Sequence, residues 1–117
     1  MSLNLKEYKR FEKQIVLKKI GINGQIKIVN SKVLIIGVGG LGCPLITYLT
    51  ASGVGNLGIV DHDKVEISNL NRQTLFTIKD LGKFKVDQAK NKIMKLNHKI
   101  KIKTHKKRIN FKNIKSI

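Results

Sequence analysis

The sequence predicts an α/β fold built around a parallel sheet. Two short apolar runs, 33–36 and 57–60, lack the polar alternation of a half-exposed strand, which is typical of strands inside a parallel sheet. Between them, apolar residues recur at helical spacing, so strand, helix and strand form a βαβ unit. A chain of 117 residues is long enough for one folding unit and short for two.

The N-terminal segment, residues 1–32, is expected to be helical. Leu5, Tyr8, Phe11 and Ile15 are spaced three or four residues apart and mark one face of a helix. Glycine and asparagine interrupt residues 21–31, which predicts a turn followed by a second short helix.

The strand expected at 33–36 leads into a glycine-rich turn and a helix. Leu41, Leu45 and Tyr48 continue at helical spacing as far as Gly53, a residue suited to end a helix. Pro44 falls in the first turn, where the missing backbone N–H does little harm.

After the second strand, the chain is expected to add a helix, a strand and the start of another helix. Residues 83–96 place Val86, Ala89 and Ile93 on one helical face. Residues 99–104 alternate lysine with isoleucine or threonine, as in a half-buried edge strand whose lysines discourage further pairing. Residues 110–117 predict a helix that begins at Asn110 as its cap.

The turn after the first strand carries the pattern GxGxxG, from Gly37 through Gly39 to Gly42. Between a strand and a helix, Gly37 permits the tight turn, Gly39 lets the backbone approach a phosphate, and Gly42 allows close packing of helix on strand. The N-terminus of the following helix favours an anion. Asp61 ends the second strand, where its carboxylate can accept hydrogen bonds from ribose hydroxyls.

These features predict a Rossmann-like nucleotide-binding half-domain at 33–117. We expect a three-layer arrangement around a parallel sheet that is truncated after its third strand. The helical segment 1–32 is expected to fold as a single unit with it.

The segment after Asp61 distinguishes two classes of nucleotide. A hydride carrier needs a nicotinamide pocket, and nothing in this segment predicts one. Asn69, Arg72 and Lys85 instead offer polar and cationic groups suited to a triphosphate. Spacing alone leaves open a simpler interpretation of Arg72 and Lys85 as solvated cations in a lysine-rich chain.

Composition bears on partners and location. The chain carries 24 basic and 7 acidic residues, a formal net charge of +17. No helix-turn-helix, aromatic stacking surface or zinc motif accompanies this charge, so we expect no nucleic-acid partner. No apolar stretch approaches the roughly 20 residues that span a bilayer, so we expect no membrane association and a cytoplasmic location.

We interpret Cys43, the single cysteine, as a structural thiol because no histidine lies near it in the sequence.

With these motifs in place, the chain resembles the N-terminal, ATP-binding part of the ubiquitin-activating-like adenylyltransferases of the ThiF, MoeB and HesA type. The resemblance rests on residues 10–15, 20–28, 33–76 and 81–86, and its most specific part is the run DxDxVxxSNLxRQ at 61–73. It implies ATP and Mg²⁺ as cofactors. It also implies adenylation of the C-terminal carboxylate of a ubiquitin-like sulfur-carrier protein, of the thiamin or molybdopterin type.

The resemblance also assigns roles to individual residues. Asp61 holds the ribose, with Asp63 as a less specific helper, while Asn69, Arg72 and Lys85 address the phosphates. Arg72 and Lys85 are the two catalytic candidates. The nucleotide-contacting glycines are Gly37, Gly39, Gly40 and Gly42.

Two departures from the family pattern stand out. Lys13 occupies the place of an arginine that reaches into the ATP site of the partner subunit, and lysine keeps the charge but loses the planar fork. The family's DxxDN-like motif, whose aspartate organises Mg²⁺, does not occur within these residues. We therefore expect weak ATP binding and no adenylation by the isolated chain. The alternative is a non-catalytic module that binds nucleotide or a partner.

The first strand predicts a homodimer. In a sheet of order 3-2-1-4 the fourth strand lies beside the first, and no fourth strand is predicted here. Residues 33–36 are therefore expected at an open edge without charge, where a second copy can pair antiparallel.

Overall fold

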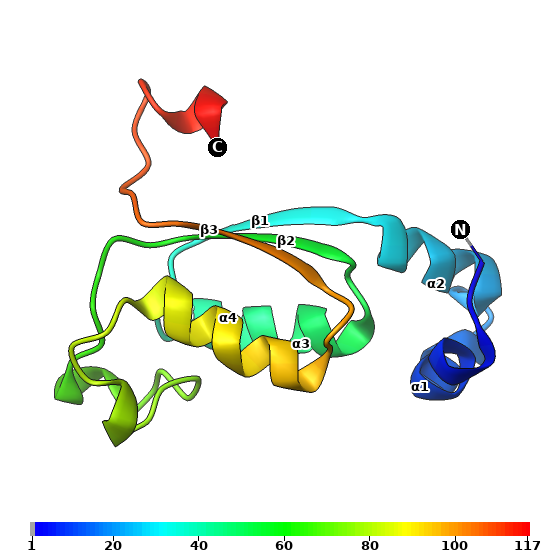
Figure 1. Ribbon diagram of the computed structural model, residues 1–117. Coiled ribbons are helices and arrows are strands. Elements are labelled where there is room, and N and C mark those ends of the chain that lie inside the picture. The colour runs from blue at the N-terminus through cyan, green and yellow to red at the C-terminus, as the bar shows by residue number, and fades with distance from the viewer. Residues whose placement is uncertain (1) are drawn as a thin grey trace.

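The computed structural model describes residues 2–117 and contains a three-stranded parallel sheet (Figure 1). The strands are β1 (Lys32–Ile36), β2 (Asn56–Val60) and β3 (Lys101–His105), and they lie in the order β1-β2-β3. Ile35 of β1 stands opposite Ile59 of β2, which stands opposite Thr104 of β3. The α/β Rossmann-like prediction is confirmed, with β1 and β3 at the two edges.

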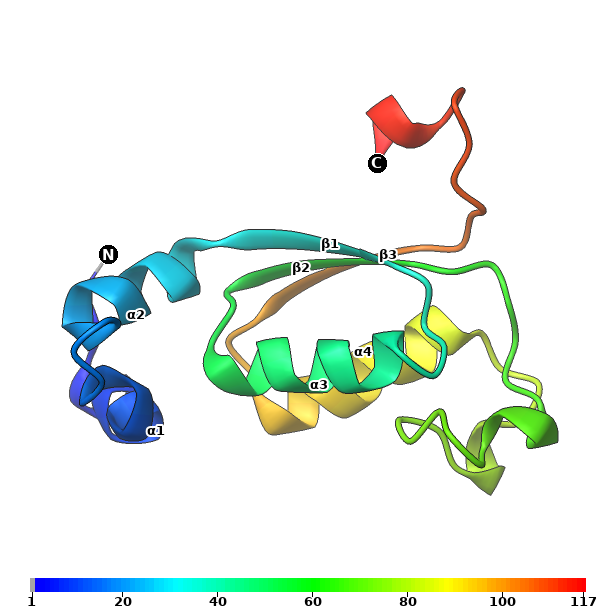
Figure 2. The ribbon, with the colours of Figure 1, turned by 180° about the vertical axis from the view of Figure 1, so that it is seen from behind.

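Four α-helices accompany the sheet within residues 2–117: α1 (Leu5–Ile15), α2 (Gly21–Asn30), α3 (Gly42–Ser52) and α4 (Lys85–Leu96). Three short 3₁₀ helices lie at Ile67–Asn69, Ile78–Asp80 and Ile114–Ser116. Helices α3 and α4 cover the same face of the sheet, as both views show (Figures 1 and 2). Ile35, Ile46, Ile59 and Ile93 are buried between these two layers.

No α-helix within residues 2–117 covers the opposite face of the sheet, on whose side the C-terminal segment lies (Figure 1). Leu34 is 44% exposed and Ile36 is 59% exposed, although the unbroken apolar run of β1 predicted burial on both sides. Residues 2–117 thus supply one sheet and one helical layer of the expected three-layer arrangement.

Helix α3 presents a different face to the core than its leucine spacing indicates. Cys43, Ile46 and Thr50 are buried, whereas Leu41 is 89% exposed and Tyr48 is 73% exposed. Gly53 ends the helix with φ of 102°, as expected for a glycine in the left-handed region. The apolar stripe that includes Leu41 and Tyr48 therefore lies on the surface.

Helices α1 and α2 are attached to the C-terminal end of α3. Phe11 is 3% exposed, and Gln14 donates a 2.7 Å hydrogen bond to the side chain of Gln25. Both glutamines also donate to the carbonyl of Ser52, at 3.0 and 2.9 Å. The division of the chain at residues 32 and 33 remains a prediction.

Two local expectations differ from the structure. Helix α2 begins at Gly21, without the separate turn that its glycines and asparagines predicted. Residues 110–117 contain turns and a 3₁₀ helix and no α-helix, although the Asn110 side chain does accept hydrogen bonds from the backbone N–H groups of Lys112 and Asn113. Among residues 2–117, no helix has both the length and the apolar character needed to cross a membrane.

Candidate functional site

The glycine loop connects β1 to α3 at the carboxyl edge of the sheet. Gly37 adopts φ of 97° and donates a 2.7 Å hydrogen bond to the carbonyl of Val60, which fastens the start of the loop to β2. A Cβ atom at Gly42 would lie 2.1 Å from the Gly37 carbonyl oxygen. Only glycine fits at position 42, because the helix starts directly against the loop.

Asp61 links this loop to the end of β2. Its Oδ2 accepts a 2.7 Å hydrogen bond from the backbone N–H of Val38, and its Oδ1 accepts one of 2.8 Å from the backbone N–H of Asp63. The carboxylate therefore lies at the loop, as predicted, and helps to shape it. Each oxygen keeps a further lone pair for a ligand hydroxyl.

The segment after Asp61 returns to the loop at residues 72 and 73. A Cβ built on Gly40 would lie 3.5 Å from Cδ of Arg72, and one built on Gly39 would lie 3.9 Å from Nε2 of Gln73. Gln73 is 3% exposed, and its buried Oε1 has no hydrogen-bond partner. Arg72 is exposed, and its Nη1 donates to the carbonyl of Ser68 at 3.1 Å.

Lys85 is the first residue of α4 and is only 6% exposed. It forms no salt bridge and no side-chain hydrogen bond with any residue in the described range 2–117. Its backbone N–H donates to the carbonyl of Asp63 at 3.1 Å, which ties the start of α4 to the segment beyond β2. The interpretation of Lys85 as a solvated cation is therefore wrong.

The positive charge of Lys85 acts on the thiol of Cys43, which directly follows the glycine loop. Burial raises the pKa of this thiol, while a hydrogen bond from the Leu75 backbone and the positive charge of Lys85 oppose the rise. A buried thiol with a raised pKa is a poor nucleophile, which fits the structural role expected for Cys43.

Asn69 and Asp63 lie in the same segment but are partly engaged elsewhere. The Asn69 Oδ1 accepts a 2.8 Å hydrogen bond from the backbone N–H of Glu66, so its NH₂ group is the part left for a ligand. The Asp63 side chain is 56% exposed, and its Oδ1 lies 3.2 Å from Nε2 of His62. Asp61, His62 and Asp63 are the one group of possible metal ligands among residues 2–117, with ligand atoms within 4.8 Å of one another.

Three further residues of the candidate site follow β3, and no sequence motif marked them. Lys107, Arg108 and Ile109 line a cavity of about 290 Å³ together with Gly37 and Asp61. Their place in the site could have been predicted, because the carboxyl ends of parallel strands meet at the same edge of the sheet. The residues directly after the third strand should have been candidates.

Comparison with known proteins shows the family of this chain. The family model described as "ThiF family" matches residues 11–117. The chain belongs to the ThiF family. Over 105 residues it is 49% identical to the adenylyltransferase and sulfurtransferase uba4 of Ogataea parapolymorpha, covering 90% of this chain and 27% of that protein. It is 47% identical over 103 residues to the adenylyltransferase and sulfurtransferase MOCS3 of Culex quinquefasciatus, covering 88% of this chain and 24% of that protein. The chain thus spans about a quarter of these relatives.

Solved structures share the fold of this ThiF-family chain. The crystal structure of PaaA superposes with a TM-score of 0.85 at 34% identity, covering 93% of this chain and 36% of that one. The crystal structure of E. coli MccB with ATP gives a TM-score of 0.77 at 34% identity, covering 80% of this chain and 28% of that one.

Lys13 lies away from the loop of its own ThiF-family chain. It is exposed on α1, and α1 lies at the opposite end of the sheet from the segments around Asp61 (Figure 1). Lys13 therefore does not join the site formed by Gly37, Asp61, Arg72 and Lys85.

Proposed function

We propose that this chain is the ATP-binding portion of an adenylyltransferase that activates the C-terminal carboxylate of a ubiquitin-like sulfur-carrier protein. The observation that carries the proposal is Lys85, which is only 6% exposed and forms no salt bridge within residues 2–117, and whose charge acts on Cys43 directly after the glycine loop. A buried charge without a partner is unfavourable, so this position suits a protein that binds an anion there.

The loop and α3 complement the triphosphate of ATP. No side chain caps the N-terminus of α3, whose 11 residues begin at Gly42. In its first turn, the N–H of Cys43 already donates to the carbonyl of Gly39 and Pro44 has no N–H. The N–H of Gly42 is therefore the one left for a phosphate oxygen, and the helix dipole adds a favourable field. Arg72, packed over Gly40, can bind phosphate through two N–H groups, while Lys85 supplies a point charge.

The adenosine portion fits the other side of the loop. Asp61 retains acceptor capacity for ribose hydroxyls, and Ile36 and Ile109 offer apolar surface in the cavity that also contains Asp61. We expect Mg²⁺ to arrive with the nucleotide, since carboxylate oxygens are its usual protein ligands. Asp61 and Asp63 are the carboxylates available for it.

In the proposed reaction, a carboxylate oxygen of the carrier protein attacks the α-phosphorus of ATP. An acyl-adenylate forms and pyrophosphate leaves. Arg72 and Lys85 would stabilise the negative charge that builds up on the phosphates. The names of the relatives, adenylyltransferase and sulfurtransferase, support this chemistry, as does an ATP complex of MccB.

We further propose that the protein acts in the cytoplasm as a homodimer. Lys13 is exposed and distant from its own glycine loop, so it is free to reach the site of a second copy. This arrangement would place one cation from each chain in the partner's site.

Calorimetric titration with ATP tests the binding proposal. Lys85→Met should weaken ATP binding at least about tenfold, because a charged contact with phosphate is lost. Lys83→Met is the matched control, since Lys83 is exposed two residues earlier, and it should bind ATP like the wild type. Equal affinity of all three proteins would contradict the proposal.

Carrier-dependent exchange between ATP and pyrophosphate separates the enzyme from the non-catalytic alternative. The portion of a relative that follows this region can be added as a separate polypeptide, together with its carrier. Exchange that requires this chain and is lost in Arg72→Ala would support the adenylyltransferase. ATP binding without exchange under these conditions would favour the binding module.

A further inference from the structure

A second cavity, of about 430 Å³, lies between α1 and the turn that joins α4 to β3. Phe11, Val29, Gly53, Gly55 and Ile100 form its apolar part. These residues lie at the amino edge of the sheet, whereas Gly37 and Asp61 lie at the carboxyl edge. The volume is in the range of small-molecule sites, which are concave and mostly apolar.

The apolar wall of this cavity is rigidly packed. A Cβ at Gly53 would lie 2.7 Å from Cζ of Phe11, and a Cβ at Gly55 would lie 1.9 Å from the carbonyl oxygen of Val29. Phe11 and Ile100 are 3% and 5% exposed. The cavity is therefore present before any ligand arrives, and no large rearrangement is needed to open it.

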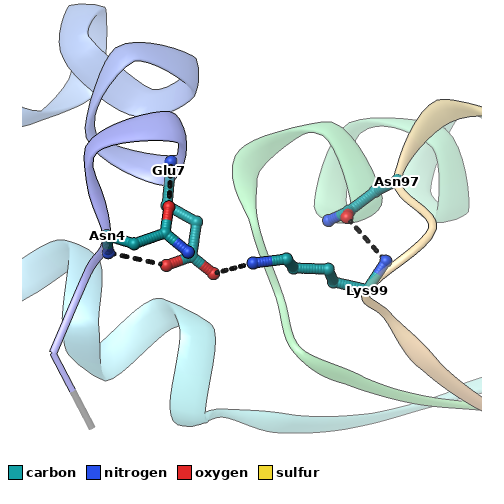
Figure 3. A network of polar contacts seen from close by, with 4 residues as sticks. All are labelled: Asn4, Glu7, Asn97 and Lys99. Atoms are coloured by element: carbon teal, nitrogen blue, oxygen red, sulfur yellow. Dashed lines mark hydrogen bonds and ion pairs between the residues drawn. The ribbon is translucent and has the colours of Figure 1, made fainter.

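The one carboxylate at the cavity is already engaged (Figure 3). Glu7 Oε2 accepts a 3.0 Å hydrogen bond from the backbone N–H of Asn4, and Oε1 accepts one of 3.3 Å from Nζ of Lys99. The hydrogen bond from Asn4 lowers the pKa of Glu7, against a smaller opposing effect of burial, and Lys99 lowers it further. The charge of Glu7 is thus matched by Lys99.

The remaining charges on the rim are positive. Lys6 and Lys9 lie three residues apart on α1 and form no salt bridge with any residue in the range 2–117. Arg10 also lines the cavity and donates through Nη2 to the carbonyl of Leu96, which leaves its other N–H groups available. An apolar wall thus meets a rim with an excess of cations.

We propose that this cavity binds a small amphiphilic anion, a carboxylate carried on an acyl or aromatic body. The apolar body would pack on Phe11, Val29 and Ile100 and would thereby be removed from contact with water. The carboxylate would lie at the rim, within reach of Lys6 and Lys9, where charge-assisted hydrogen bonds favour it. The site does not depend on the proposed ATP site, because the two occupy opposite edges of the sheet.

Two-dimensional ¹H–¹⁵N NMR of the full chain tests the proposal with octanoate as the probe. Octanoate at low ionic strength should shift the amides of Phe11, Gly55 and Ile100 in a saturable way and leave that of Gly39 unchanged. Octanol, with the same apolar body and no charge, should bind at least about fivefold more weakly. ATP added to the octanoate complex should not displace octanoate.

A charge-reversed variant localises the anion. Lys6→Glu with Lys9→Glu should weaken octanoate binding about fivefold to tenfold, since two favourable charges become repulsive. The control, Lys112→Glu with Lys115→Glu, has the same spacing on an exposed C-terminal segment and should bind like the wild type. The proposal is overturned if octanol binds as tightly as octanoate, if the shifts appear away from the cavity, or if a folded Lys6/Lys9 variant binds unchanged.

Discussion

The carboxylate of Asp61 accepts a 2.7 Å hydrogen bond from the backbone N–H of Val38. This contact joins the end of β2 to the glycine loop that follows β1, across 23 residues of sequence. The residue proposed to hold the ribose therefore also helps to fix the shape of the loop proposed to bind the phosphates. In the proposed site, this single side chain would couple the stability of the loop to nucleotide binding.

Substitution of Asp61 should consequently affect folding as well as binding. Asp61→Ala removes two acceptors from backbone N–H groups and should lower the free energy of unfolding by about 1.5 to 3 kcal/mol, measured by urea denaturation. The same variant should weaken binding of ATP and AMP alike. If Asp61→Ala weakened binding but left the unfolding midpoint unchanged, the hydrogen bond to Val38 would have no structural role.

Substitution of Lys85, unlike that of Asp61, should raise the stability of the protein while it weakens ATP binding. Lys85→Met keeps the aliphatic part of the side chain and removes an unpaired charge from a residue that is only 6% exposed. Without nucleotide, this variant should be more stable than the wild type by about 1 kcal/mol, while it binds ATP more weakly. A less stable Lys85→Met protein would mean that the ammonium group has a stabilising partner when folded.

Asp80 should contribute a pH-dependent stability. Burial opposes ionisation of this side chain, but hydrogen bonds from Thr77 and the nearby Lys92 outweigh it and lower the pKa of Asp80 below its usual value of 3.8. The unfolded chain therefore binds the proton at higher pH than the folded chain does. The stabilisation is present above about pH 4 and is lost as the pH falls through the folded-state pKa.

Urea denaturation between pH 6 and pH 3 measures the pH-dependent stability that the Asp80 carboxylate contributes. Asp80→Asn should lower stability by about 2 kcal/mol at pH 6, and the difference from the wild type should shrink toward pH 3. The control Asp87→Asn removes an exposed ion pair with Lys106 and should change stability by less than about 1 kcal/mol. A constant difference across this pH range would show that the Asp80 carboxylate is not the cause.

The open edge of β1 should support self-association. Within residues 2–117, β1 pairs only with β2, and no residue between 33 and 60 is charged. The rest of the chain is strongly basic, so salt should strengthen the dimer by screening repulsion. Ile36→Lys, at a position that is 59% exposed, should reduce dimer formation in analytical ultracentrifugation. A wild-type protein that stays monomeric at high concentration and moderate salt would contradict this.

Local sequence patterns predicted the parts of the site that depend on strand ends and glycine geometry. Gly37, Gly42 and Asp61 were found because a tight turn, a close helix approach and a carboxylate at a strand end each require particular residue types. The order of the three strands followed from the Rossmann-type order 3-2-1-4. These features are encoded within short segments.

The remaining features depend on contacts between distant segments. The spacing of Leu41, Leu45 and Tyr48 is that of a buried helical stripe, yet the core selects the face of Cys43 and Ile46. These two side chains pack in one cluster with Ile35 and Ile59 of the sheet, a contact that no local pattern specifies. Whether Lys85 is buried or solvated was likewise undecided by a lysine-rich sequence. Its burial depends on how the segment from Asp61 to α4 folds back over the loop.

The most direct test of the ATP site compares ATP with adenosine in one Arg72→Ala variant. Arg72 packs over Gly40 on the side of the loop assigned to the phosphates, so its loss should weaken ATP binding about tenfold to a hundredfold, as expected for one or two charged hydrogen bonds. Adenosine, which has no phosphate, should bind the variant and the wild type equally well in calorimetric titrations. Equal losses for adenosine and ATP, or no loss for ATP, would place Arg72 away from the phosphates and contradict the proposed site.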